Sequence, residues 1–496
     1  MARNDGALKA DSIGAVEAAA QSFGSMSPIM ALCLVTPIIA AGAGLATPAA
    51  IMLAGIASLL CGRTIARFAS RWSSAGSLLT YATVSLGPSW GLYSGIVYTT
   101  AMSLLTVGGV AFLAHITGAF FQFHAAFSEL VLACITSLAI GLICYQGVQL
   151  STRVQLLITA VSAFFVLLLG IVIIVQRSTT GGGVPHGGHG MKIPRLPGTA
   201  FPGTVTRLWK SMLPSTAPSF SGFCKATLSA LLIFAGYESA AAFGEETKDA
   251  PRTVPKAIVF TVIICGLFYW WASVTLALGY DTGKDWASDS STLVTLGTRF
   301  VGHWGGTLLF VMVLFDGWAG SLACVNLVSR LCYALSRQEF LPKILGSIGS
   351  HGTPYFAIAT ITFVTIVICI GTVSVGGKLE TIFGFAVDAG GVMVQTSYFL
   401  VMIGGCIEFK SMEAALAATV PLGAVLGSFL GGTLSLGYKF ALAFLIVLGV
   451  LVMCCAWYFP DRIARAVEGI HGKAVIGSGS SKEDSNEVEA EPFLKA

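Results

Sequence analysis

Runs of about 20 apolar residues recur along almost the whole chain, and a run of this length crosses the roughly 30 Å hydrocarbon core of a bilayer as a helix. Of the 496 residues, 55% are hydrophobic and only 10% are charged, which is too few charges to wet the surface of a soluble protein. Because a backbone in lipid must satisfy its own hydrogen bonds, each run should be helical. The sequence therefore predicts an all-α, polytopic membrane protein surrounded by a lipid bilayer.

Charged breaks and breaks rich in proline and glycine divide the apolar runs into about twelve predicted spans. They are residues 14–43, 48–67, 86–114, 127–147, 153–176, 225–246, 255–279, 304–335, 354–374, 380–404, 413–433 and 440–459.

Basic residues mark one side of the membrane. They follow the second, eighth and twelfth spans, at Arg63, Arg67, Arg71, Arg330, Arg337, Lys343, Arg462 and Arg465. Short loops rich in arginine and lysine stay in the cytoplasm, so we expect a multi-pass protein of the plasma or inner membrane with both termini cytoplasmic. The basic residues form no continuous stripe, which argues against a nucleic-acid partner.

Two of the predicted spans contain polar interruptions. The first has Gly24 and Pro28 among hydroxyl side chains, and the sixth has Gly236 beside Tyr237 and Glu238. Proline removes a backbone donor and glycine tolerates non-helical dihedrals, so both helices should break or at least kink there. Interruptions five spans apart are typical of an inverted repeat with a substrate site near the membrane midplane. Free amides at such breaks favour a carboxylate, and free carbonyls favour an ammonium group.

Three stretches of the sequence resemble the amino acid, polyamine and organocation permeases. They are residues 234–258, which include Phe-Ala-Gly-Tyr-Glu-Ser and Pro-Arg-Thr-Val-Pro-Lys, residues 67–88 and residues 326–342. The likeness extends over residues 12–460. It implies a LeuT-type core of five plus five inverted spans with two extra helices. It also implies alternating access around a site between spans one, three, six, eight and ten.

The resemblance also implies a division of the chain into six segments. These are a cytoplasmic N-terminus (1–11), a first inverted repeat of spans one to five (12–176), an external loop (177–222), a second inverted repeat of spans six to ten (223–405), two further spans (406–460) and a cytoplasmic tail (461–496). The tail is too polar to bury a core, so we expect it to be disordered.

The resemblance carries substrate-binding roles to residues at the two interruptions. Backbone groups expected to meet the substrate carboxylate belong to Gly24, Ser25, Met26 and Ser27. Residues expected to offer carbonyls to the substrate amino group are Phe234, Ala235 and Gly236, with Tyr237 shaping or gating the pocket.

Three acidic residues lie well inside predicted spans, away from the span ends, where an ionisable side chain is costly and usually functional. We expect Glu238 to be a proton-sensitive or gating group, the alternative being a carboxylate that ties the sixth span to a neighbour. Asp316 and Asp388, in spans eight and ten, could bind a cationic side chain of the substrate or share a proton. The alternative is that they cap local breaks beside Gly317 and Gly390.

These features predict a secondary transporter for amino acids that works as a proton symporter or an exchanger. A polyamine or other organic-cation carrier is the alternative within transport, and a channel or nutrient receptor is the alternative of another class. No enzyme is expected, since no nucleophile with a base and no metal cluster is found, and no cofactor is expected beyond the coupling proton. Gly423, Gly427 and Gly431 recur every four residues, which favours close helix packing or, alternatively, a homodimer face.

Overall fold

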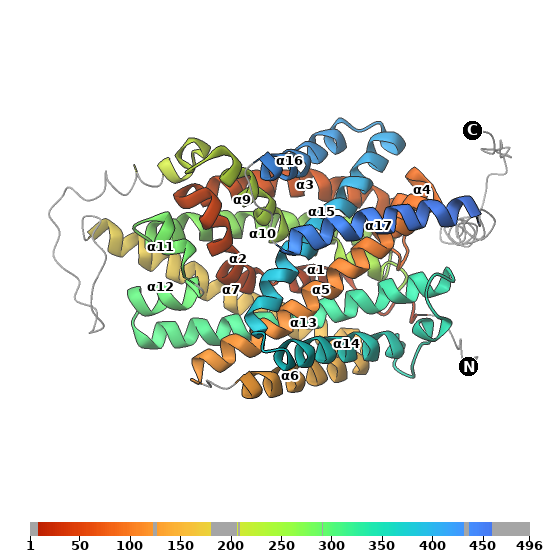
Figure 1. The fold of residues 1–496 in the computed structure, drawn as a ribbon, viewed down its shortest axis with the longest axis horizontal. Helices are drawn as coiled ribbons and strands as arrows, with labels where there is room; N and C mark the ends of the chain where they lie inside the picture. The colour runs from red at the N-terminus through yellow and green to blue at the C-terminus, as the bar shows by residue number, and fades with distance from the viewer. Residues whose placement is uncertain are drawn as a thin grey trace.

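The computed structural model describes residues 8–122, 126–179, 206, 209–289, 291–430 and 436–458. The regular structure of these residues is helical, apart from one isolated bridge between Ile13 and Thr247. Most of the long helices run along the long axis of the molecule as one bundle (Figure 1). The all-α fold predicted from the apolar runs is confirmed.

The α-helices of the described chain are α1 (Ala15–Met26), α2 (Pro28–Ala43), α3 (Thr47–Arg71), α4 (Leu78–Leu86), α5 (Pro88–Phe120), α6 (Ala126–Gln146), α7 (Val148–Thr179), α9 (Phe220–Leu232), α10 (Ala250–Gly279), α11 (Gly283–Ala287), α12 (Thr292–Phe300), α13 (His303–Arg337), α14 (Tyr355–Ser374), α15 (Leu379–Phe409), α16 (Met412–Leu430) and α17 (Leu436–Tyr458). Short 3-10 helices are η1 (Gly44–Ala46), η2 (Pro214–Thr216), η3 (Tyr237–Phe243) and η4 (Lys343–Gly346).

Ten segments of the described chain are long and apolar enough to cross a membrane. The first of them, Ala15–Arg71, is 57 residues long and contains α1, α2 and α3, so the ten segments hold more than ten helices. The apolar part of α16 within the described residues, Met412–Gly423, is shorter than a full span. A polytopic membrane protein is therefore confirmed, while the count of twelve spans stays a prediction.

Proline and glycine set where several of these helices begin. Pro28 and Pro88 occupy the first positions of α2 and α5, where a backbone N–H would have no helical partner and the fixed φ of proline suits the helix. Gly87, which joins α4 to α5, has φ +94°, a conformation that glycine adopts without strain. The predicted span 86–114 corresponds to α5, and the short helix α4 before it was not predicted from the apolar runs.

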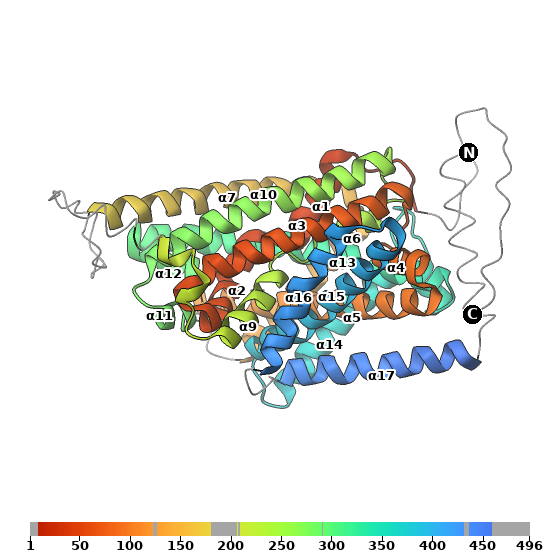
Figure 2. The same cartoon turned by 90° about the horizontal axis from the view of Figure 1, so that it is seen from above.

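Burial separates the central helices from the peripheral ones. In the most apolar part of Phe220–Phe243, which holds α9 and η3, 94% of the residues are buried, compared with 17% in Leu436–Met453 of α17. Figure 2 shows α17 at the edge of the bundle. Large apolar side chains are exposed on outer helices, for example Phe164, Ile171, Phe260, Leu267, Ile446 and Val450. Such an apolar outer surface fits a bundle whose solvent is lipid.

The ends of α3 and α13 lie at the same end of the bundle, which we call the basic end. Arg337 at the end of α13 and the amide of Ala75 after α3 both bind the carboxylate of Glu245, at 2.7 Å and 3.2 Å. The helices α11 and α12 lie at the opposite end (Figure 1). The basic residues after the second and eighth predicted spans are thus brought to one side, as the charge pattern predicted.

Several predictions fall on residues outside the described chain. Residues 1–7, most of the predicted external loop 177–222, Gly431 and the predicted tail 461–496 are in this group. The described helices meet that loop at Thr179, where α7 ends, and at Phe220, where α9 begins. The division into two inverted repeats stays a prediction.

Candidate functional site

The first predicted interruption is a break between two helices. Ser27 lies between α1 and α2. Its φ of 41° is a left-handed conformation that is uncommon for a residue with a side chain. The helix axis is interrupted because Pro28 has no N–H with which to continue the hydrogen-bond ladder. Ser25 and Ser27 stay half-buried although they lie deep in the bundle, so open space adjoins the break.

The second predicted interruption lies between α9 and η3. Here Gly236 has φ +109°, and a Cβ atom added to it would lie 2.8 Å from the carbonyl carbon and the Cβ of Ser25. Only a residue without a side chain allows this approach. The two broken spans therefore contact each other at Ser25 and Gly236.

The free amides at the start of α2 are bound by a carboxylate from α13. Asp316 Oδ2 accepts hydrogen bonds from the backbone N–H groups of Ile29 and Met30, both at 2.9 Å. Its other oxygen, Oδ1, accepts from the hydroxyl of Thr159 on α7 at 3.2 Å. Asp316 is fully buried. A carboxylate is favoured at this position because unpaired amides and the helix dipole give the start of α2 a partial positive charge.

The residues predicted to hold a substrate carboxylate lie one turn earlier in the chain. Gly24, Ser25 and Met26 form the last turn of α1, where helical amides bond to the carbonyls four residues back. The amide of Ser27 donates to the carbonyl of Gly24 at 3.0 Å. The amides at the break that have no backbone partner are therefore those of Ile29 and Met30, which bind Asp316.

Residues of the second interruption surround the end of α9. The hydroxyl of Tyr269 donates to the carbonyl of Ile233 at 2.9 Å, and Ser22 Oγ donates to the carbonyl of Tyr237 at 2.7 Å. The ring of Phe234 packs edge to face on Tyr269, with centroids 5.2 Å apart. Phe234 therefore directs its ring toward α10, and Ala235 is the last residue before the glycine turn at Gly236.

Glu238 is fully buried and is held by hydroxyl groups from two other helices. Tyr98 on α5 donates to Oε1, and Tyr398 on α15 donates to Oε2. The amide of Gly236 also donates to Oε2, at 3.2 Å. The ring of Tyr237 lies 5.5 Å from that of Tyr398. One carboxylate thus connects the break in the sixth span with α5 and α15.

Asp388 lies elsewhere in the bundle. A Cβ atom added to Gly437 at the start of α17 would lie 2.6 Å from the Cβ of Asp388 and 3.1 Å from the carbonyl oxygen of Phe385. The side chain is half-buried at this contact between α15 and α17. The structure brings Asp316 and Glu238 to the two breaks and Asp388 to a peripheral helix.

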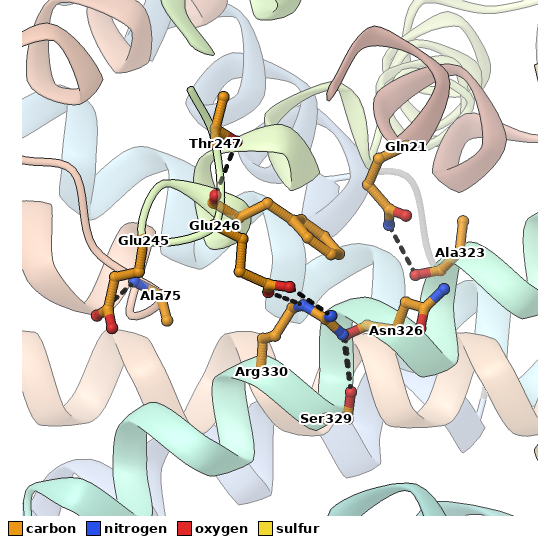
Figure 3. Close-up of polar contacts among 10 residues, drawn as sticks. Gln21, Ala75, Glu245, Glu246, Thr247, Ala323, Asn326, Ser329 and Arg330 are labelled. Atoms are coloured by element: carbon orange, nitrogen blue, oxygen red, sulfur yellow. Dashed lines mark hydrogen bonds and ion pairs between the residues drawn. The ribbon is translucent and has the colours of Figure 1, made fainter. Parts of the chain in front are cut away.

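An ion-pair network at the basic end joins α13 to η3 and the residues that follow it. Arg330 donates through Nε and Nη2 to the two oxygens of Glu246, at 2.7 Å and 3.2 Å, and through Nη1 to the carbonyl of Asn326 at 3.0 Å (Figure 3). The guanidinium lies 4.2 Å from the ring of Phe243. Both charged side chains are buried, with 0% and 3% exposed. Glu245 and Glu246, which follow the sixth predicted span, thus both form ion pairs with arginines of α13.

Residues before and within α1 also bind at the basic end. The amide of Ile13 donates to the carbonyl of Glu246, and the amide of Lys248 donates to the carbonyl of Ile13, both at 2.9 Å. Glu17 on α1 pairs with Arg153 on α7 at 2.8 Å. The segment before the first break is therefore fixed to the elements that close the basic end.

A cavity of about 840 Å³ lies at the other end of the bundle. Its lining includes Ala40, Gly44, Lys210, Asp281 and Lys284. Ala40 is twelve residues beyond Pro28 on α2, which corresponds to roughly 18 Å of helix. This cavity, which we call the chamber, therefore lies roughly 18 Å along α2 from the first break.

The chain matches the model of a known protein family, described as amino acid permease, over residues 13–466. It belongs to the amino acid permease family. The permease is similar to the branched-chain amino acid permease BcaP of Bacillus subtilis, at 23% identity over 65% of this chain and 66% of that protein. The match thus spans just under two thirds of that relative's length. A shorter region, 26% of this chain, is 32% identical to 30% of the low-affinity putrescine importer PlaP of Escherichia coli.

A solved structure supports the fold. The manganese transporter of Eremococcus coleocola aligns with the permease at a TM-score of 0.53, over 91% of this chain and 95% of that chain. Only 10% of the aligned residues are identical, so this likeness shows the fold alone. The transporter fold implied by the sequence resemblance is confirmed.

Sequence reasoning missed the partners of both buried acids. Tyr98 and Tyr398 lie in long apolar helices, where a tyrosine usually signals packing or an interfacial anchor. Thr159 bonds to Asp316 from α7, in whose predicted span no substrate-binding or coupling residue was expected. An apolar span with one hydroxyl gives no sign of which carboxylate that hydroxyl will meet.

Gly320 on α13 allows this helix to approach the first break. A Cβ atom added to Gly320 would lie 1.4 Å from Ser27 Oγ and 2.8 Å from Ser27 Cβ. We expect Gly320→Ala to reduce initial transport rates by about tenfold or more, because overpacking of about 1–3 kcal/mol would act on the moving break. Adding Ser27→Gly should restore most of the rate, since it removes both clashing atoms and glycine suits φ 41°. Equal rates for Gly320→Ala and the wild type would contradict the expected close contact.

Proposed function

We propose that this permease is a secondary active transporter that moves amino acids, or amines derived from them, across the cell membrane by alternating access. The observation that carries the proposal is the contact between two broken helices with buried acids beside them, at Ser25 and Gly236. Broken helices of this kind build substrate sites in transporters because they free backbone groups without exposing them to lipid. The names of the relatives support the substrate class.

The network at the basic end supports alternating access. The pairs Arg330–Glu246, Arg337–Glu245 and Arg153–Glu17 hold that end shut, while the chamber lies at the other end. We assign the basic end to the cytoplasm because arginine-rich loops stay there. Substrate then enters from the external chamber and leaves when the Arg330–Glu246 contact opens.

We assign proton coupling to Glu238. Its carboxylate is buried between three helices. The hydroxyl groups of Tyr98 and Tyr398 donate hydrogen bonds to it, so protonation of the carboxylate would change both bonds. A proton on Glu238 would turn an acceptor into a donor and change how α5 and α15 are held. Binding and release of one proton would thereby alter the packing around the break.

Uptake into proteoliposomes tests this function. Purified permease is reconstituted, and a labelled panel of neutral, acidic and basic amino acids and of their decarboxylated amines is offered, with and without an inward proton gradient. We expect saturable uptake of at least one compound and accumulation when the gradient is present. Uptake that rises linearly with concentration would favour a channel. No movement of any compound, even with the same compound preloaded inside, would overturn the proposal.

A further inference from the structure

Every backbone N–H group at the start of α2 already has a hydrogen-bond partner. The amide of Ser27 bonds to the carbonyl of Gly24, Pro28 has no N–H, and the amide of Ala31 bonds to the carbonyl of Ser27. The two remaining amides, of Ile29 and Met30, both bond to Asp316 Oδ2. A helix start with its amides satisfied has none left for a ligand.

A substrate carboxylate at this break would therefore compete with Asp316. To bind, it would have to displace a fully buried carboxylate that is also held by Thr159 on its other oxygen. The displaced side chain would be left as a buried charge without partners, next to a second negative group. The chain thus already supplies a carboxylate where an α-amino acid would place its own.

The charges near the breaks favour a cation. The helices α1 and α9 both end here, and the C-terminal end of a helix carries partial negative charge. Asp316 and Glu238 add two carboxyl groups, and among the described residues neither has a lysine or arginine as an ion-pair partner. An ammonium group would find carbonyls and carboxylates around it.

We propose that Asp316 replaces the substrate carboxylate and that the permease prefers an amine without an α-carboxylate, such as a diamine or a decarboxylated amino acid. The inference rests on the proposed transport function and specifies the substrate of the same site. Asp316 acts as a specificity residue: it occupies the two amides, and its negative charge favours the ammonium group. The bound amine lies between the ends of α1 and α9.

Matched pairs of compounds test the substrate preference. Putrescine and ornithine, cadaverine and lysine, and isoamylamine and leucine differ only by the α-carboxylate. Exchange in proteoliposomes is measured for each compound with wild-type permease. We expect half-maximal exchange at a concentration of the amine at least about tenfold lower than that of its amino acid. One unmet hydrogen bond of a charged group gives a difference in affinity of this size.

Variants of Asp316 test the cause of that preference. Asp316→Gly opens both amides and should shift the ratio of amine to amino acid affinity at least about tenfold toward the amino acid. Asp316→Asn keeps an oxygen that can accept from the amides and should weaken amine binding without improving amino acid binding. Asp388→Asn, at the contact between α15 and α17 and away from both breaks, is the matched control and should keep the wild-type preference.

The outcomes separate the inference from the proposed function. If wild-type permease prefers the amino acid in every pair, the inference is wrong and the transport function stands, and this result does not depend on any variant folding. If Asp316→Gly transports with an unchanged ratio, Asp316 is not the specificity residue. If wild-type permease moves no member of any pair but does move another amino acid of the panel, the inference is wrong and the transport function stands; if it moves no compound of the panel, the transport function itself fails.

Discussion

Replacing Arg330 with methionine is expected to lower the free energy of unfolding by about 3–5 kcal/mol, the usual cost of removing one partner of a buried ion pair. Arg330 is 0% exposed and Glu246 3% exposed, and the pair is bidentate. Without the guanidinium, the carboxylate would remain buried beside Phe243 with no counter-charge. The carbonyl of Asn326 would also lose one of its donors, although the hydroxyl of Ser329 still donates to it. Thermal unfolding of the purified permease in detergent would measure the change.

Two controls make this prediction specific. The double variant Arg330→Met with Glu246→Leu removes both charges and should recover much of the lost stability, because an apolar pair of similar volume often replaces a buried ion pair at little cost. The single variant Arg337→Met breaks a pair whose side chains are 29% and 28% exposed, so it should cost less than about 1 kcal/mol. A double variant as unstable as Arg330→Met would show that packing, and not the unpaired charge, dominates.

Transport should respond differently from stability in the double variant. The Arg330–Glu246 pair holds the segment after η3 against α13, and the backbone bonds of Ile13 hold the same segment to the residues before α1. The apolar side chains at positions 330 and 246 of this double variant would still pack together, but they would hold the basic end closed less specifically than the ion pair does. We therefore expect the double variant to regain stability but to leak substrate without the proton gradient.

Substituting Glu238 with glutamine is expected to abolish proton-driven accumulation while exchange of substrate for substrate continues. Glutamine keeps the size of the side chain and an oxygen that can accept a hydrogen bond from Tyr98 or Tyr398. Its amide group does not titrate, so it cannot bind or release the coupling proton. The loss should be complete, because accumulation above equilibrium requires a coupled ion. The measurement is uptake in proteoliposomes with an imposed proton gradient, compared with exchange at equal pH.

The matched control is another acid on the same stretch of chain. Glu245 lies at the basic end, binds Arg337 and the amide of Ala75, and is partly exposed. Glu245→Gln should therefore keep gradient-driven accumulation, even if its rate falls. If Glu238→Gln still accumulates substrate against its gradient, Glu238 is not the coupling group, and Asp316 becomes the next acid to test.

The helices and their breaks were predictable because both depend on local chemistry. Apolar runs long enough to cross a bilayer leave a helix as the only structure that satisfies the backbone. The left-handed turn at Ser27 falls within residues 22–28, and the turn at Gly236 falls within residues 234–239, as predicted. Each follows from proline or glycine at that point of the chain.

The partners of the buried acids were not predictable, and the substrate and coupling roles of the predicted site residues stay predictions. Asp316 binds the amide of Ile29 across 287 residues of sequence, and Tyr398 binds Glu238 across 160. Hydropathy places a residue in the membrane but gives neither the rotation of its helix nor the identity of its neighbours. The same sequence signal, an aspartate one or two residues before a glycine inside an apolar span, marked Asp316 and Asp388.

The sequence by itself therefore determined that this chain is a helical membrane protein with two broken spans and acidic residues at membrane depth. Only the tertiary structure decided that Asp316 lies on the free amides of α2, that two tyrosines hold Glu238, and that Asp388 faces α17. The physical reason is that helix formation in lipid is settled within each segment, whereas the pairing of buried polar groups depends on how separate helices pack.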